Sequence, residues 1–257
     1  MNDLDLINPA FAKPRNMCSL GAGIPLIMSL CSIALSSGAA PDTPYLQNPL
    51  TLFFTLTLTI SLALVCLPRI FNWGWSVEYF FVASIQLACI GMLGGTPWLC
   101  FLLYASIPLP YRLVFFIVYL GVIATLSTKI WRMYQDVRND PQLLGQLYQV
   151  RNKQTFYLQK NDVRLLEKKY RLSLFPNAGY FLLFAGLAFG TMPFAKTIVG
   201  FVGLPFPHIF LGIFSIPIDM MALAFLTRGW FVYYHLPKHF DPQRPTVYVD
   251  MVTKTRR

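Results

Sequence analysis

Charge is what this sequence has least of. Only 12% of its 257 residues are acidic or basic, whereas 55% are hydrophobic and the mean hydropathy is +0.51. Ordinary soluble domains carry about 25% charged residues, so composition excludes a typical soluble globular protein. We therefore expect a polytopic membrane protein.

Catalytic and metal-binding motifs are also missing. The chain has no GxSxG nucleophile motif, no glycine-rich phosphate loop and no paired carboxylates placed for acid and base catalysis. Its five cysteines stand singly, without a CxxC pair, which is typical of small core residues. We expect no cofactor and no metal, and no residue argues for an enzyme.

Long apolar runs take the place of these motifs. A helix needs about 20 residues to cross the hydrocarbon core of a bilayer. Six runs approach that length, and acidic or basic residues are confined to the last one and to the edges of the third and fourth. They are 18–37, 49–67, 77–93, 111–128, 177–194 and 208–227. The sequence predicts an all-α bundle of six transmembrane helices.

The basic residues predict the orientation of these spans. Residues 129–175 contain ten Lys/Arg against four Asp/Glu, and residues 228–257 contain six against two. Cationic loops resist translocation, so both segments and both termini should be cytoplasmic. All five tryptophans then fall at predicted helix ends, where indole rings prefer to lie. We expect a multi-pass protein of a bacterial-type inner membrane.

Four sections follow from this map: the first four helices (1–128), a basic cytoplasmic loop (129–176), helices five and six (177–227) and a basic tail (228–257). The first apolar run and the "SSGAAP" after it also fit a signal peptide cleaved near Ala39 or Ala40. Either interpretation leaves the other five spans oriented in the same way.

The predicted hairpins resemble one another. "GGTPWLCFLLYASIPLPYR" (94–112) and "GTMPFAKTIVGFVGLPFPH" (190–208) share a Gly-Thr, a proline and a final Pro-x-Pro. This pattern fits three tandem two-helix hairpins, although the shared needs of any membrane hairpin explain it equally well. The apolar parts 98–109 and 197–206 are too short to span a bilayer, so we expect re-entrant or interfacial segments.

Asp219 is the acidic residue placed inside a predicted span. An ionised carboxylate there costs at least about 2.5 kcal/mol, so the side chain should face other helices or water. Pro217 removes a backbone donor nearby and can open the helix. Gln86 and the row formed by Thr51, Thr55 and Thr59 are the candidate polar partners. We expect either a proton or cation site or a hydrogen-bonded packing contact.

Few charged or titratable residues fall on the predicted outer side. Arg112, Lys196 and His208 flank the outer ends of spans four, five and six. If the protein moves an ion, we expect these three residues at the outer mouth of its pathway.

The cytoplasmic loop contains its own structural signals. Asp140 and Pro141 predict the start of a short helix through about Val150. Residues 154–159 and 245–252 look like strands that pair in a small cytoplasmic cap. Residues 161–172 read as a basic amphipathic helix that lies on the membrane or docks a partner. Its cations are Arg164, Lys168, Lys169 and Arg171.

The net charge of +10 is concentrated beside membrane spans, so anionic lipid headgroups are expected as partners and nucleic acid is not. The sequence favours a non-enzymatic component, partner or protector of a membrane assembly, with Asp219 and the basic loop as contacts. The alternative is a small transporter or channel that uses Asp219 as its ion site.

Overall fold

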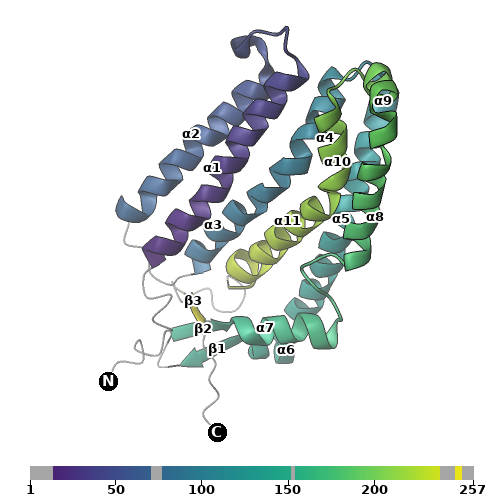
Figure 1. Cartoon of the computed structure of the whole chain (residues 1–257). Coiled ribbons are helices and arrows are strands. Elements are labelled where there is room, and N and C mark those ends of the chain that lie inside the picture. The colour runs from purple at the N-terminus through teal and green to yellow at the C-terminus, as the bar shows by residue number, and fades with distance from the viewer. Residues whose placement is uncertain (1–13, 71–76, 152–153, 238–246, 251–257) are drawn as a thin grey trace.

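The computed structural model describes residues 14–70, 77–151, 154–237 and 247–250, and the chain is mostly helical (Figure 1). Long helices lie side by side, and a small sheet with short helices covers one end of them. The long elements are α1 (Pro14–Ala39), α2 (Pro49–Ile70), α3 (Val77–Ala88), α4 (Met92–Tyr104), α5 (Leu109–Asn139), α8 (Ala178–Gly190), α9 (Ala195–Val202), α10 (Phe206–Phe214) and α11 (Ile216–Gly229).

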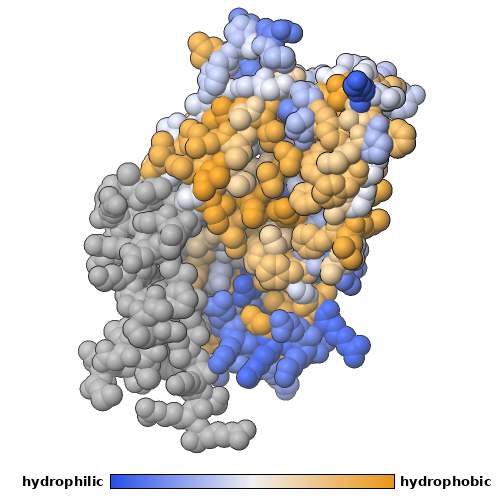
Figure 2. Space-filling model, viewed as in Figure 1, coloured by the Kyte–Doolittle hydropathy of each residue, from blue (hydrophilic) through white to orange (hydrophobic). Residues whose placement is uncertain are grey.

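Within the described ranges, three helical segments are long and apolar enough to cross a membrane. They are 80–104, 109–139 and 178–202, and a fourth is 206–235 if its two bent parts form one span. Helices α1 and α2 are shorter in their described apolar portions. Figure 2 shows a broad apolar band across the helical part, with hydrophilic side chains gathered at the end that carries the sheet. These features fit a membrane protein.

The predicted re-entrant segments are instead continuations of helices. Residues 98–104 belong to α4, which follows α3 through one 3₁₀ turn, η4 (Cys89–Gly91). Residues 195–202 form α9, which follows α8 through the 3₁₀ turn η6 (Met192–Phe194). Continued helix satisfies the backbone internally, which apolar surroundings require. The prediction placed the end of each span too early because the glycine, threonine and proline residues at 94–97 and 190–193 looked like turns.

The expected three hairpins do not pack as three equivalent units. Helix α1 packs along α2, whereas α5 makes most of its contacts with α11 rather than with α4, its hairpin neighbour. The two similar turns do touch, because Ser106 donates its backbone N–H to the carbonyl of Val202 over 2.8 Å. Gly203 follows in a left-handed conformation with φ of 75°.

Hydroxyl pairs join α1 to its neighbours. Ser36 shares a hydrogen bond with Thr51 of α2 (3.0 Å), and Thr96 of α4 donates to Ser32 (2.8 Å). In addition, Thr55 and Thr59 donate to carbonyls one turn earlier in their own helix. The threonine row therefore supports helix packing and does not contact Asp219.

The cap at the other end follows the predicted outline. Asp140 accepts hydrogen bonds from the backbone N–H groups of Gln142 and Leu143 and so caps α6 (Pro141–Leu147). This helix ends three residues earlier than expected, because residues 148–151 form strand β1 (Tyr148–Arg151).

The predicted pairing of the loop with the tail is confirmed. Strand β2 (Gln154–Leu158) lies between β1, which is antiparallel to it, and β3 (Val247–Asp250), which is parallel, with Tyr157 opposite Val249. The remaining short elements are the 3₁₀ turn η3 (Tyr45–Gln47), helix α7 (Gln159–Arg164), and two π-helical segments, η5 (Leu165–Lys169) and η7 (Trp230–His235).

The predicted basic helix thus corresponds to α7 and η5. Leu165 and Leu166 are buried in the core of the cap, so its apolar side faces protein and is not available to a membrane. Its four cations, Arg164, Lys168, Lys169 and Arg171, are exposed. The amphipathic pattern arose from packing against the sheet and the ends of α5 and α11.

Candidate functional site

The site around Asp219 forms where the bent pair of α10 and α11 packs against α4. Helices α10 and α11 are bent by 52° at Ser215, two residues before Pro217. The backbone N–H of Asp219 donates to the carbonyl of Ser215 (2.9 Å) in the first turn of α11. A proline in this turn can donate no hydrogen bond, which favours a break here. This bend agrees with the prediction that Pro217 can open the helix.

The carboxylate lies directly against the backbone of α4. A Cβ atom on Gly94 would lie 2.1 Å from Oδ2 of Asp219 and 2.0 Å from Oγ of Ser215. A Cβ atom on Gly91, at the end of η4, would lie 3.0 Å from the Cβ of Ala222. Glycine at both positions allows α11 to approach α4 this closely.

Tyr119 is the polar partner of the buried acid. Its hydroxyl donates to Oδ2 of Asp219 over 3.0 Å, and the aspartate is only 3% exposed. The other carboxylate oxygen, Oδ1, is buried without a hydrogen-bond partner among the described residues. A buried polar atom without a partner costs about 1–3 kcal/mol, so this oxygen is suited to accept a proton or a cation.

Trp98 connects this site to α10. Its ring stacks on Tyr119 with centroids 4.6 Å apart, and its Nε1 donates to the Gly212 carbonyl over 2.8 Å. We expected Trp98 at a helix end, but it lies inside α4, where it holds Tyr119 against Asp219. Ile216 and Met220 are buried beside Tyr119, so the surroundings are otherwise apolar.

The structure does not bring Gln86 to Asp219 as a hydrogen-bond partner. Gln86 is buried in α3, and neither its Nε2 nor its Oε1 has a partner among the described residues. Arg228 pairs with Asp162 and not with Asp219. The intramembrane polar site therefore consists of Asp219 and Tyr119, with Pro217 beside the bend.

The residues expected at an outer mouth have different environments. His208 is buried, and its Nε2 lies 2.7 Å from the Leu35 carbonyl of α1. Arg112 donates from Nη1 to the Leu102 carbonyl (2.8 Å), and Lys196 is exposed on α9. All three belong to the end of the helical part opposite the sheet (Figure 1). Within the part of the chain that the structure describes, no hydrogen bond or ion pair joins these three side chains.

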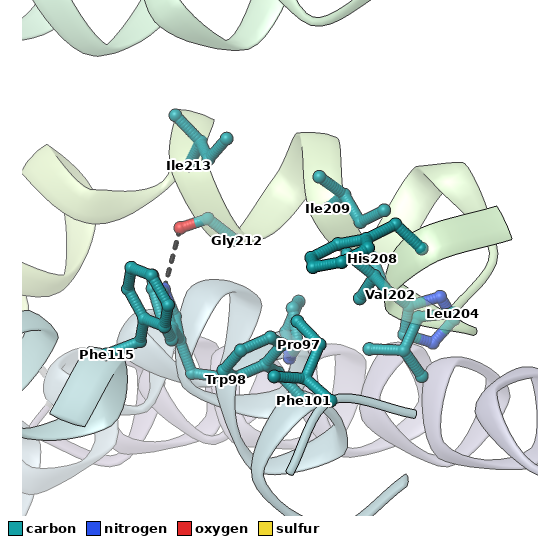
Figure 3. Close-up of a pocket in the computed structure, with 12 residues that line it drawn as sticks. Pro97, Trp98, Phe101, Phe115, Val202, Leu204, His208, Ile209, Gly212 and Ile213 are labelled. Atoms are coloured by element: carbon teal, nitrogen blue, oxygen red, sulfur yellow. Dashed lines mark hydrogen bonds between the residues drawn. The ribbon is translucent and has the colours of Figure 1, made fainter. Parts of the chain in front are cut away.

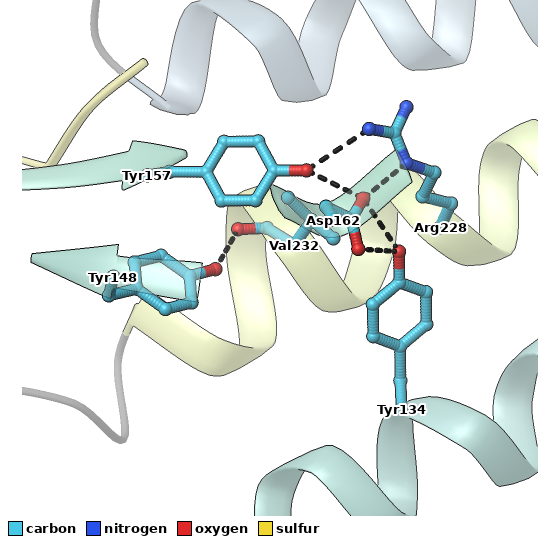
Figure 4. Close-up of polar contacts among 6 residues, drawn as sticks. All are labelled: Tyr134, Tyr148, Tyr157, Asp162, Arg228 and Val232. Atoms are coloured by element: carbon cyan, nitrogen blue, oxygen red, sulfur yellow. Dashed lines mark hydrogen bonds and ion pairs between the residues drawn. The ribbon is translucent and has the colours of Figure 1, made fainter. Parts of the chain in front are cut away.

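A second polar cluster, unforeseen from the sequence, lies where the cap meets the helices (Figure 4). Asp162 is fully buried and pairs with Arg228, whose Nε lies 2.8 Å from Oδ2. Tyr157 donates to the same oxygen over 2.7 Å, and Tyr134 of α5 donates to Oδ1 over 2.8 Å. Arg228 also donates from Nη2 to the Tyr157 hydroxyl.

This cluster is suited to a structural role, in which it holds the cap on the helices, rather than to catalysis. It joins α5, α11, β2 and α7 in one network, and Tyr148 adds a hydrogen bond to the Val232 carbonyl (2.6 Å). Burial raises the pKa of Tyr157 and of Tyr148 well above the usual range, so both stay neutral. A fully paired and hydrogen-bonded ion pair of this kind fixes geometry.

Local sequence patterns did not identify Tyr119, Gly94 and Asp162 as site residues. Tyr119 is 100 residues from Asp219, and Asp162 looked like one charge among many in a basic loop. The available signal was the double glycine at 94–95 within an apolar run, which is typical of close helix approach.

Comparisons with protein-family models, curated proteins and solved structures find no match to this chain. The proposal of a function therefore depends on the site itself.

Proposed function

We propose that this chain crosses a bacterial-type inner membrane six times, with the cap and both termini on the cytoplasmic side, and carries a proton or small cation through the Asp219 carboxylate. Helices α1 and α2 would supply the two spans beyond the four long or bent ones. The basic residues of the cap support this orientation, because cationic segments stay on the cytoplasmic side.

One observation carries the transport proposal. Asp219 lies just after the bend between α10 and α11, with one carboxylate oxygen held by Tyr119 and the other without a partner among the described residues. Intramembrane carboxylates are costly and are a common feature of ion pathways, and interrupted helices are frequent at transporter binding sites. The unpaired oxygen could bind and release a proton while Tyr119 holds the side chain in place.

The burial of Asp219 argues against a contact between this residue and a partner protein. A side chain that is 3% exposed and covered by Gly94 and Tyr119 cannot reach a partner helix outside the chain. The geometry therefore favours the alternative function, transport, over a contact made by this residue.

A flux assay tests this function. The purified protein is reconstituted into liposomes that contain a pH-sensitive dye, and a potassium gradient with valinomycin sets the membrane potential. We expect potential-driven proton or cation flux for the wild type, loss of flux for Asp219→Asn, and normal flux for the control Asp42→Asn, which removes an exposed acid between α1 and α2. Flux that survives in folded Asp219→Asn would overturn the proposal.

The second candidate is the assembly component. The apolar side of the predicted basic helix is buried in the cap, so only its cationic side is free to bind a partner. This exposed surface is formed by Arg164, Lys168, Lys169 and Arg171. Such a surface fits an acidic segment of a partner protein or anionic headgroups. Copurification in mild detergent tests it. Companions retained by the wild type and lost when Lys168 and Lys169 are changed to glutamine would favour it, and identical profiles would oppose it.

A further inference from the structure

A cavity of about 260 Å³ lies between α4 and α10, near the end of the helices opposite the cap. Figure 3 shows Pro97, Trp98 and Phe101 of α4 on one side and residues of α10, including Gly212 and Ile213, on the other. Almost all of its lining is apolar. Its volume is slightly below the range of about 300–1,000 Å³ typical of small-molecule pockets, which suits a narrow occupant.

The cavity opens through the apolar outer surface. Phe115 of α5 and Phe201 of α9 both line it, yet they are 51% and 72% exposed. Side chains that line a cavity and are also exposed mark its mouth. Leu113 and Val114, next to Phe115 in α5, are also exposed apolar residues. In a membrane, such an opening faces acyl chains.

A basic residue lies beside the same mouth. Arg112 precedes Phe115 by three residues, or about 4.5 Å along the helix axis. It donates from Nη1 to the carbonyl of Leu102, the residue after Phe101, and the rings of Phe101 and Phe115 pack edge to face. Its Nε is buried without a hydrogen-bond partner among the described residues. Nη1 uses one of the five N–H donors of the guanidinium, and Arg112 is only partly buried, so its terminal nitrogens keep further donors for a ligand at the rim.

We propose that the cavity holds one acyl chain of an anionic phospholipid whose phosphate binds Arg112. A guanidinium matches a phosphate in charge and in the geometry of its N–H groups. The chain would enter between Phe115 and Phe201 and pack against Trp98. This site rests on the proposed membrane crossing and is independent of ion transport through Asp219.

Quenching of Trp98 fluorescence tests this site. The detergent-purified protein is titrated with phosphatidylglycerol or phosphatidylcholine that carries brominated acyl chains, since bromine quenches a nearby indole. Each titration is repeated with Trp98→Phe, and the difference isolates Trp98 from the other four tryptophans. We expect quenching of Trp98 by both lipids, with phosphatidylglycerol acting at about fivefold lower concentration, as one basic residue facing an anionic headgroup predicts.

Variants separate the two parts of the site. Arg112→Gln should remove the preference for phosphatidylglycerol, while the control Lys129→Gln, an exposed cation near the cap end of α5, should keep it. Ile213→Phe, which fills the cavity, should reduce quenching by both lipids. Equal quenching by the two lipids in the wild type, or a preference that persists in Arg112→Gln, would overturn the proposal.

If Arg112→Gln does not fold, Arg112→Lys is the second variant. It keeps the charge but loses the forked donor geometry. We expect this variant to retain only part of the preference, and a full preference would contradict a phosphate bound by the guanidinium. Because no step of this test measures flux, its failure and the failure of the transport proposal are distinguishable.

Discussion

The hydroxyl of Tyr119 donates to Oδ2 of Asp219 over 3.0 Å and so joins the middle of α5 to the first turn of α11. This contact lies between residues that are 100 positions apart and gives a buried acid a neutral donor. It lies within the contact between α5 and α11, which is more extensive than that between α5 and α4.

Removal of this donor should weaken the protein without unfolding it. Tyr119→Phe leaves both carboxylate oxygens of Asp219 without a side-chain partner, and we expect a loss of about 1–3 kcal/mol. Thermal unfolding in detergent measures this loss. Tyr111→Phe is the control, because Tyr111 lies on the same helix but is 62% exposed, and it should change stability by less than about 0.5 kcal/mol. Equal effects of the two variants would contradict a special role for Tyr119.

The glycine against the carboxylate should tolerate no side chain. Gly94→Ala would place a methyl group about 2 Å from Ser215 Oγ and Asp219 Oδ2, so α4 and α11 must separate. We expect a loss of at least about 1–3 kcal/mol, as for other overpacked cores. Gly95→Ala is the matched control, because the nearest atom to its new methyl group is the Tyr119 hydroxyl oxygen at 3.9 Å. Similar unfolding temperatures for the two variants would show that the helices approach less closely.

The ion pair under the cap should be far more sensitive than the exposed cations beside it. Asp162→Asn leaves Arg228 as an uncompensated buried charge, and breaking such a pair costs about 3–5 kcal/mol. Arg164→Gln changes an exposed residue two positions away and should have little effect. Unfolding temperatures and limited proteolysis of residues 129–176 report the difference. A stable Asp162→Asn protein would mean that the network does not hold the cap.

Strand β3 should be required for a protected loop. Val249 is buried opposite Tyr157, so Val249→Asp places a charge in the cap core and should release β3 from β2. We expect faster cleavage of residues 129–176 by protease, with membrane insertion unchanged. Val150→Asp is the control, since Val150 lies on β1 but is 50% exposed. Unchanged cleavage of Val249→Asp would argue against pairing of the tail with the loop.

Alkaline pH should detach the cap before it affects the helices. Burial raises the pKa of Tyr157 and Tyr148 in the folded protein, whereas the same side chains ionise near pH 10 when unfolded. Their contribution to stability is therefore complete below about pH 10 and falls as the pH rises above it. Protease sensitivity of residues 129–176 measured from pH 8 to pH 11 should increase above about pH 10. A Tyr157→Phe, Tyr148→Phe double variant should lose less stability over this range than the wild type.

Local sequence patterns are enough to predict the membrane class, the apolar segments and the outline of the cap. All three depend on local patterns: runs of apolar residues, cations beside them, an N-cap at Asp140 and alternating strands at 154–159 and 245–252. A helix break near Pro217 and Asp219 could also be predicted, because proline disturbs the helix that contains it.

The partners of these residues depend on how distant helices pack together. Tyr119 reaches Asp219, and Asp162 reaches Arg228, across 100 and 66 residues, and no local pattern encodes such distances. Glycine and proline break isolated helices, yet residues 94–97 lie inside α4, where Gly94 permits close packing against Asp219. Packing between distant helices, which satisfies polar groups away from water, set the site that the local sequence could only suggest.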